Sequence, residues 1–121
     1  MIYFLRKIEF MITYYTLDKF KNKCIQWSME IMKEQKLVYL TRRKSEIIQL
    51  KESLNQNSFE LSQIIGHRLK GHGETFGFPQ ISVIGITMEN AANEKNIEKL
   101  KEAIESLDEN VEENLRIVNN M

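Results

Sequence analysis

Four residues in the middle of the chain, three polar and one glycine, have types and spacing suited to group transfer. His67 is followed by Lys70, Gly71 and Glu74. A neutral imidazole is a competent nucleophile near neutral pH, and a lysine ammonium can stabilise phosphate oxygens as a mobile point charge. Glycine inside a helix costs roughly 1 kcal/mol relative to alanine, so Gly71 does not serve helix stability. The pattern indicates an imidazole that another molecule must approach closely.

An ideal helix puts the chain's two histidines on opposite faces. At about 100° per residue, the core-facing stripe consists of Leu61, Ile65, Leu69, His72 and Phe76. The neighbours of His67 on the solvent face, all within about 60°, are Gln63, Lys70, Gly71 and Glu74. We therefore expect His67 to be exposed, and His72 to pack or to form a hydrogen bond at the core edge. An exposed histidine is more often an ordinary surface residue, and Lys70 with Glu74 could be an ordinary i,i+4 pair.

Apolar periodicity predicts that helices make up nearly all of the chain. One proline and five glycines leave few breaks. The apolar stripes predict helices over about residues 17–31, 37–54, 59–76, 79–93 and 97–111. Asn57 or Ser58 could cap the third helix, Gly77 could end it, and Pro79 suits the first turn of the fourth. Asn93 could end that fourth helix.

Short connections make consecutive helices antiparallel neighbours. The expected fold class is therefore all-α: an antiparallel up-down four-helix bundle over residues 37–118, with an additional N-terminal helix. Residues 1–36 form the N-terminal extension that holds this leading helix. At 121 residues the chain is long enough for one domain with a single core.

Composition excludes several classes of function. The net charge is zero, so no nucleic-acid partner is expected. The single cysteine, Cys24, cannot form an intramolecular disulfide, which suits a reducing, cytoplasmic setting, and no Cys/His cluster predicts a metal site. The apolar segment 1–12 is too short, and too broken by charges, to insert across a membrane. The absence of a glycine-rich phosphate loop predicts no nucleotide site and no cofactor.

The polar stretch resembles the signature of the histidine-containing phosphotransfer (HPt) domain of multistep His–Asp phosphorelays. That signature is His-x-Leu/Met-Lys-Gly with a variable third position, followed by a glycine six residues later. The chain has His67-Arg68-Leu69-Lys70-Gly71 and then Gly77. Matching segments lie on both sides, in Tyr39-Leu40-Thr41-Arg42-Arg43, Gly77-Phe78-Pro79-Gln80-Ile81-Ser82-Val83-Ile84-Gly85 and Met88-Glu89-Asn90-Ala91-Ala92. The resemblance covers about residues 37–115.

The resemblance implies a phosphocarrier rather than an enzyme. His67 would accept a phosphoryl group at Nε2 from a receiver-domain aspartate and pass it to another receiver. Lys70 would stabilise the phosphate, and Gly71 would give the receiver access. The receiver-docking face would include Gln63, Ile64 and Arg68, together with Gly71 and Glu74. The partners would be response-regulator receiver domains and a hybrid histidine kinase, and the Mg²⁺ needed for transfer would belong to the receiver.

Glu74 departs from the family pattern, in which a small residue is common. On the helical wheel it lies about 20° from His67, so its carboxylate could pair with Lys70 or repel an incoming phosphoryl group. Our hypothesis is that Glu74 slows transfer modestly. The alternative function is a phosphorylation-independent adaptor that binds a receiver or kinase. A histidine-kinase dimerisation hairpin fits less well, because Arg68 stands where an acidic residue is usual. The sequence leaves the oligomeric state open.

Overall fold

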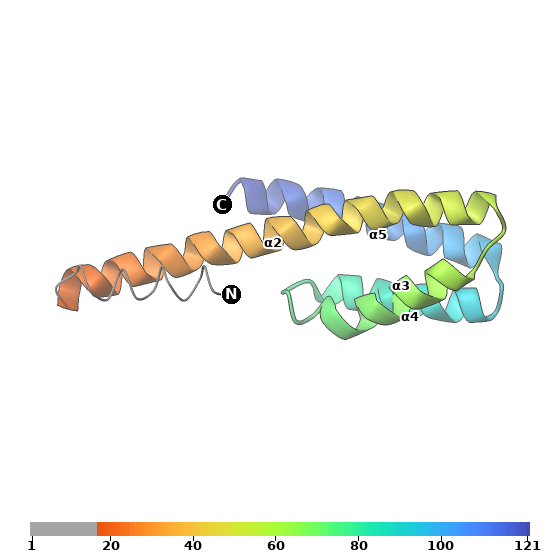
Figure 1. The fold of residues 1–121 in the computed structure, drawn as a ribbon, viewed down its shortest axis with the longest axis horizontal. Coiled ribbons are helices and arrows are strands. Elements are labelled where there is room, and N and C mark those ends of the chain that lie inside the picture. The colour runs from red at the N-terminus through yellow and green to blue at the C-terminus, as the bar shows by residue number, and fades with distance from the viewer. Residues whose placement is uncertain (1–16) are drawn as a thin grey trace. The chain divides into compact units, whose positions relative to one another are not determined.

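The computed structural model describes residues 17–121, and within them the fold is all-α. Four helices follow one another along the chain: α2 (Leu17–Asn55), α3 (Glu60–His72), α4 (Pro79–Asn93) and α5 (Ile97–Asn119) (Figure 1). The chain divides into two units, Met1–Gln35 and Lys36–Met121. The account below concerns the second unit. The apolar segment at residues 1–12 lies outside the described residues.

The first two predicted helices are one helix in the structure. Helix α2 runs from Leu17 to Asn55 without a break at Leu37. Its sequence contains neither glycine nor proline, so nothing in it interrupts the backbone ladder.

Three similar turns connect the helices of the second unit. Each is a Schellman motif, in which a residue in the left-handed conformation lets two backbone amides donate hydrogen bonds to carbonyl groups of the preceding turn. The left-handed residues are Asn57, Gly77 and Lys95, with φ of 55°, 90° and 54°. At the first turn, for example, Ser58 N donates to Ser53 O and Asn57 N donates to Leu54 O.

The structure shows that one predicted helix cap is wrong and that two predicted helix boundaries are right. Asn57 closes α2 and does not cap α3, whose N-cap is Phe59, without a side-chain hydrogen bond. Pro79 stands in the first turn of α4, as expected. Asn93 is the last residue of α4, also as expected. Asn96, which the sequence reading did not single out, caps α5 by accepting from Lys99 N.

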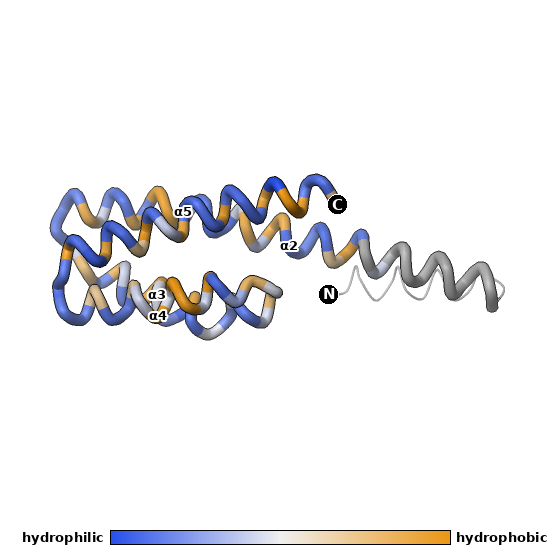
Figure 2. Tube along the Cα trace, turned by 180° about the vertical axis from the view of Figure 1, so that it is seen from behind, coloured by the Kyte–Doolittle hydropathy of each residue, from blue (hydrophilic) through white to orange (hydrophobic). Residues whose placement is uncertain are grey.

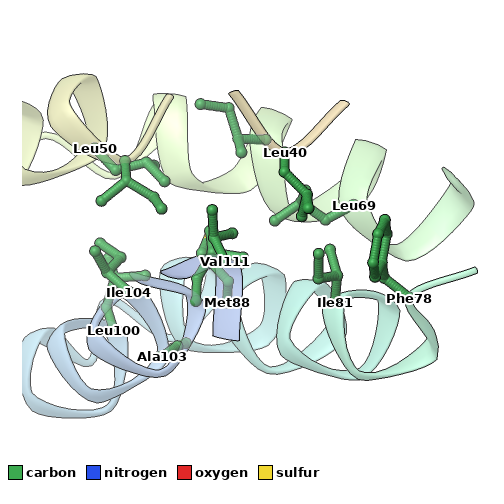
Figure 3. Packing of buried hydrophobic residues seen from close by; sticks show 14 of the residues in the cluster. Leu40, Leu50, Leu69, Phe78, Ile81, Met88, Leu100, Ala103, Ile104 and Val111 are labelled. Atoms are coloured by element: carbon green, nitrogen blue, oxygen red, sulfur yellow. The ribbon is translucent and has the colours of Figure 1, made fainter. Parts of the chain in front are cut away.

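The core lies between the helices of residues 36–121. Along the tube of Figure 2, hydrophobic residues recur among hydrophilic ones on the helices. The largest fully buried hydrophobic side chains come from all four helices and include Leu40, Leu50, Leu69, Ile81, Met88, Leu100, Ile104, Leu107 and Val111 (Figure 3). All of them but Leu107 are labelled in Figure 3. Two ion pairs link the outer sides of α2 and α5, Lys44 with Glu112 and Lys51 with Asp108.

Helices α3 and α4 lie side by side and antiparallel (Figure 1). Gln63 near the start of α3 pairs with Asn93 at the end of α4, and His67 pairs with Glu89 one turn further on. Helix α3 is also shorter than predicted, since it ends at His72 and not near Phe76. Ser82 explains the early end, because its hydroxyl accepts from Glu74 N and so takes that amide out of the helical ladder.

Candidate functional site

His67 stands on the solvent face of α3, as the helical wheel predicts. Its side chain is 69% exposed. The preceding residue, Gly66, is buried against α4. Two core residues flank the histidine along the chain, Ile65 and Leu69, and they fix the rotation of α3 about its axis. The core therefore determines that the imidazole points outward.

A glutamate on α4 orients the imidazole, and the sequence reading did not assign it this role. Glu89 Oε1 lies 3.3 Å from His67 Nδ1. A carboxylate can only accept a hydrogen bond, so Nδ1 carries the proton in this contact. A neutral ring with its proton on Nδ1 keeps a lone pair on Nε2. In this arrangement Nε2 is the ring nitrogen of His67 with an available lone pair.

The same glutamate also contacts the lysine. Glu89 Oε2 lies 3.8 Å from Lys70 Nζ. The Lys70 side chain is about half exposed, whereas that of Glu89 is 23% exposed, so the carboxylate is the more fixed partner. One carboxylate therefore holds an imidazole and an ammonium on the same face of α3.

Gly71 leaves an open space beside this pair. A Cβ atom built on Gly71 would meet nothing within 4 Å. No packing contact within the fold therefore requires a glycine at this position.

The remaining predicted site residues lie on or near this face. A shallow depression is lined by Gln63, Ile64, His67, Arg68, Glu89 and Asn93. Ile64 is 43% exposed and presents an apolar surface to the depression. Arg68 is also exposed. The depression thus combines an apolar contact, a cation and the imidazole edge.

Glu74 does not take the position that the wheel predicted. The wheel assumed a helix through Phe76, but α3 ends at His72 and Glu74 belongs to the following turn. Lys70 pairs with Glu89, and the ordered contact at Glu74 is the bond from its amide to Ser82 Oγ, at 2.8 Å. The side chain of Glu74 is exposed to solvent.

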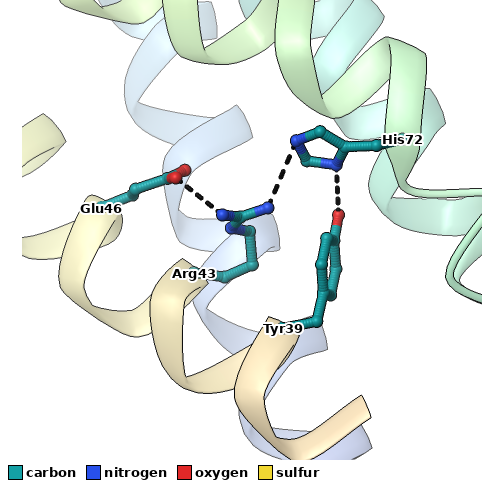
Figure 4. A network of polar contacts seen from close by, with 4 residues as sticks. All are labelled: Tyr39, Arg43, Glu46 and His72. Atoms are coloured by element: carbon teal, nitrogen blue, oxygen red, sulfur yellow. Dashed lines mark hydrogen bonds and ion pairs between the residues drawn. The ribbon is translucent and has the colours of Figure 1, made fainter. Parts of the chain in front are cut away.

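His72 belongs to a separate network on the inner side of α3. Its Nδ1 lies 2.8 Å from the hydroxyl of Tyr39, and its Nε2 lies 3.3 Å from Arg43 Nη1 (Figure 4). A guanidinium can only donate, so Nε2 accepts and Nδ1–H donates to the tyrosine oxygen. Arg43 also binds Glu46 at 2.8 Å. Both ring nitrogens are occupied, as expected for a histidine at the core edge.

The surroundings of this network keep His72 neutral. Burial lowers its pKa, and the guanidinium groups of Arg43 and Arg68 lower the pKa further. Burial also raises the pKa of Tyr39, which therefore stays a phenol. The Tyr39 ring stacks on the Phe76 ring, with 4.4 Å between the ring centroids. The guanidinium carbon of Arg43 lies over the Tyr39 ring, 4.5 Å from its centroid. The network ties the end of α3 to α2.

Among the side chains that the structure describes, those of residue 28 and residues 30–121, no group of three or more His, Cys, Asp or Glu is placed to hold a metal ion. None of the helices in that part of the chain combines the length and apolar character needed to cross a membrane.

The chain finds no match among family models, curated proteins or solved structures. The function must therefore be inferred from the site itself and from the resemblance of its residues to the HPt signature.

Proposed function

We propose that this chain is an HPt domain, a phosphocarrier in a two-component His–Asp phosphorelay. It accepts a phosphoryl group on His67 from a receiver-domain aspartate and passes it to another receiver. The observation that carries the proposal is the contact between His67 Nδ1 and Glu89, which leaves the lone pair of an exposed imidazole on Nε2. The up-down four-helix arrangement of residues 37–118 is part of the same proposal.

The transfer step needs no group beyond the two proteins and the receiver's own Mg²⁺. The Nε2 lone pair attacks phosphorus in line with the aspartyl oxygen, an N–P bond forms, and the P–O bond breaks. The electron pair of that bond returns to the aspartate carboxylate. The ring gains positive charge with its proton still on Nδ1, and the Glu89 carboxylate stabilises that charge. The reverse reaction delivers the phosphoryl group to the next receiver.

Lys70 and Gly71 serve the phosphoryl group and its donor. The Lys70 ammonium stands one helical turn from His67 and can leave Glu89 for a phosphate oxygen, since their separation of 3.8 Å is long for a hydrogen bond. Gly71 lets the receiver's active site close over the imidazole, because no side chain occupies that space. The chain is a covalent intermediate in transfer, without a nucleotide site of its own.

The partners are response-regulator receiver domains and a hybrid histidine kinase, in the cytoplasm. A receiver presents an acidic pocket, which Arg68 and Lys70 complement in charge. Ile64 and Gln63 supply the apolar and polar contacts around the imidazole. Since Glu74 lies beyond the end of α3, any slowing of transfer by its carboxylate should be smaller than the wheel implied.

The test is to measure covalent labelling of the purified chain. The protein is incubated with a low-molecular-weight phosphodonor and, separately, with a panel of phosphorylated receivers. We expect a label that is labile in acid and stable in alkali, as phosphohistidine is. The label should disappear in His67→Gln and persist in His72→Gln, which removes the chain's other histidine.

Two variants separate transfer from docking. Lys70→Ala should slow labelling while the circular dichroism spectrum keeps its helical signal, because Lys70 is exposed. Gly71→Leu should block labelling by receivers far more than labelling by the small phosphodonor. Receiver binding without any label would instead identify the chain as a phosphorylation-independent adaptor.

A further inference from the structure

Two glycines bring the backbones of α3 and α4 into direct contact. A Cβ on Gly66 would lie 2.8 Å from Glu89 N and 2.9 Å from Gly85 O. A Cβ on Gly85 would lie 2.6 Å from Lys70 N and 2.7 Å from Gly66 O. These neighbours are backbone atoms, which cannot rotate away as a flexible side chain can. Any larger residue at either position must therefore push the helices apart.

Each of these glycines touches the backbone of a residue in the site. Gly66 lies against Glu89 and is the neighbour of His67 in sequence, while Gly85 lies against Lys70. The close packing of α3 and α4 brings Glu89 into contact with both His67 and Lys70, but both contacts are long. The distance is 3.3 Å from Glu89 Oε1 to His67 Nδ1 and 3.8 Å from Glu89 Oε2 to Lys70 Nζ. A small increase in the helix separation would break the first of them.

We infer that Gly66 and Gly85 are positioning residues that act through Glu89. They set the distance between α3 and α4 at which the Glu89 carboxylate can hold His67 in the Nδ1–H form. The effect on phosphoryl transfer rests on the proposed function, but the effect on the proton position does not. These two consequences can therefore be measured separately.

Alanine is the smallest side chain that tests this inference. Non-bonded carbon contacts are favourable at about 3.5 Å or more. A Cβ added at Gly66 or Gly85 would lie 2.6–2.9 Å from backbone atoms of the other helix. The helices would therefore have to separate by roughly 1 Å to accommodate it. The Nδ1 to Oε1 distance then exceeds hydrogen-bonding range. Without the carboxylate, nothing in the site selects the Nδ1–H form of the ring.

The experiment reads the imidazole directly. Nitrogen-15 NMR of the side chain reports which ring nitrogen carries the proton, and the spectrum of His67→Gln assigns the two histidines. In the parent protein, neutral His67 should be in the Nδ1–H form. In Gly85→Ala it should shift toward the Nε2–H form. Labelling by a small phosphodonor should fall by about ten- to a hundredfold, the scale expected for a misplacement of about 1 Å.

Gly73→Ala is the matched control. A Cβ on Gly73 would lie 2.6 Å from Ser82 N, so this variant strains the same helix pair at its other end, away from Glu89. It should lose stability as Gly85→Ala does but leave the proton of His67 on Nδ1. The same shift in both variants would mean that the glycines serve packing alone, and would overturn the inference.

A second variant covers the case in which Gly85→Ala does not fold. Glu89→Asp keeps both glycines and the helix contact but shortens the carboxylate arm by one methylene. It should produce the same move of the His67 proton with little loss of helix. A ring that stays in the Nδ1–H form in Glu89→Asp would show that reach is not limiting, and the inference would be wrong. If no variant or parent protein accepts phosphate, the proposed function fails, and the NMR result still decides this inference.

Discussion

Acidification is expected to destabilise the second unit through His72. The pKa of His72 is lowered from its ordinary value of about 6.5 by burial and by the nearby Arg43 and Arg68. The unfolded chain therefore binds this proton more readily than the folded protein does. The stabilisation from His72 is complete above pH 6.5 or so and is lost as the pH falls from there toward the folded-state pKa. The free energy of unfolding should decrease with falling pH in that window.

The structure gives the cause of this destabilisation, and proton linkage sets an upper limit on its dependence on pH. Arg43 Nη1 uses the lone pair on Nε2, at 3.3 Å, and a proton on Nε2 would put a cation against the guanidinium. A single titrating group changes the free energy of unfolding by at most about 1.4 kcal/mol per pH unit. His72 is only half-buried, so solvent screening should keep the observed slope below this limit.

The assay is urea unfolding followed by circular dichroism between pH 7.5 and 5.5. The parent protein is compared with His72→Gln and with His67→Gln, the matched variant of the other histidine. In the parent and in His67→Gln, the free energy of unfolding should include the same pH-dependent contribution from His72. In His72→Gln, the free energy of unfolding should depend less steeply on pH. Equal slopes for the parent and His72→Gln would refute the reasoning, because the proton would then be taken up elsewhere.

Three further predictions concern stability and are measured by the same urea unfolding. Ser62 is fully buried and its hydroxyl has no hydrogen-bond partner. Ser62→Ala should therefore leave the free energy of unfolding unchanged or raise it by up to about 1 kcal/mol. A decrease of that size would mean that the hydroxyl does form a hydrogen bond. Leu107→Ala should lower the free energy of unfolding by about 2–5 kcal/mol, because Leu107 is fully buried in the core. Gly71→Ala should raise it by about 0.5–1 kcal/mol, because the added methyl group meets no neighbour. Destabilisation by Gly71→Ala would contradict the open space at that position.

Much of the site could be predicted because helical periodicity is a local property. The exposed position of His67 and the inward position of His72 both follow from the apolar stripe that includes Ile65 and Leu69. Gly77 and Pro79 also stand where local turn chemistry requires them. A helical wheel fails where the helix stops, which is why Glu74 was assigned to a face that it does not occupy.

The residues that the sequence reading missed are those supplied by another helix. Glu89 has no special spacing from His67 along the chain, being 22 residues away. The signal that could have found it is the pair Gly66 and Gly85, since small residues facing each other predict a close helix crossing. Arg43 and Tyr39 likewise meet His72 only because α2 packs against α3.

The sequence by itself determined that residues 36–121 are mostly helical and that His67 faces solvent beside Lys70 and Gly71. It also determined which side of their helices is buried, except at Phe76, which was predicted to face the core but is 39% exposed. These properties depend on the period of the α-helix and on burial of apolar surface. Only the tertiary structure decided where α3 ends and which carboxylate reaches the imidazole. The end depends on Ser82. The carboxylate depends on how closely α3 and α4 approach, a distance fixed by backbone contacts at Gly66 and Gly85 that no periodicity encodes.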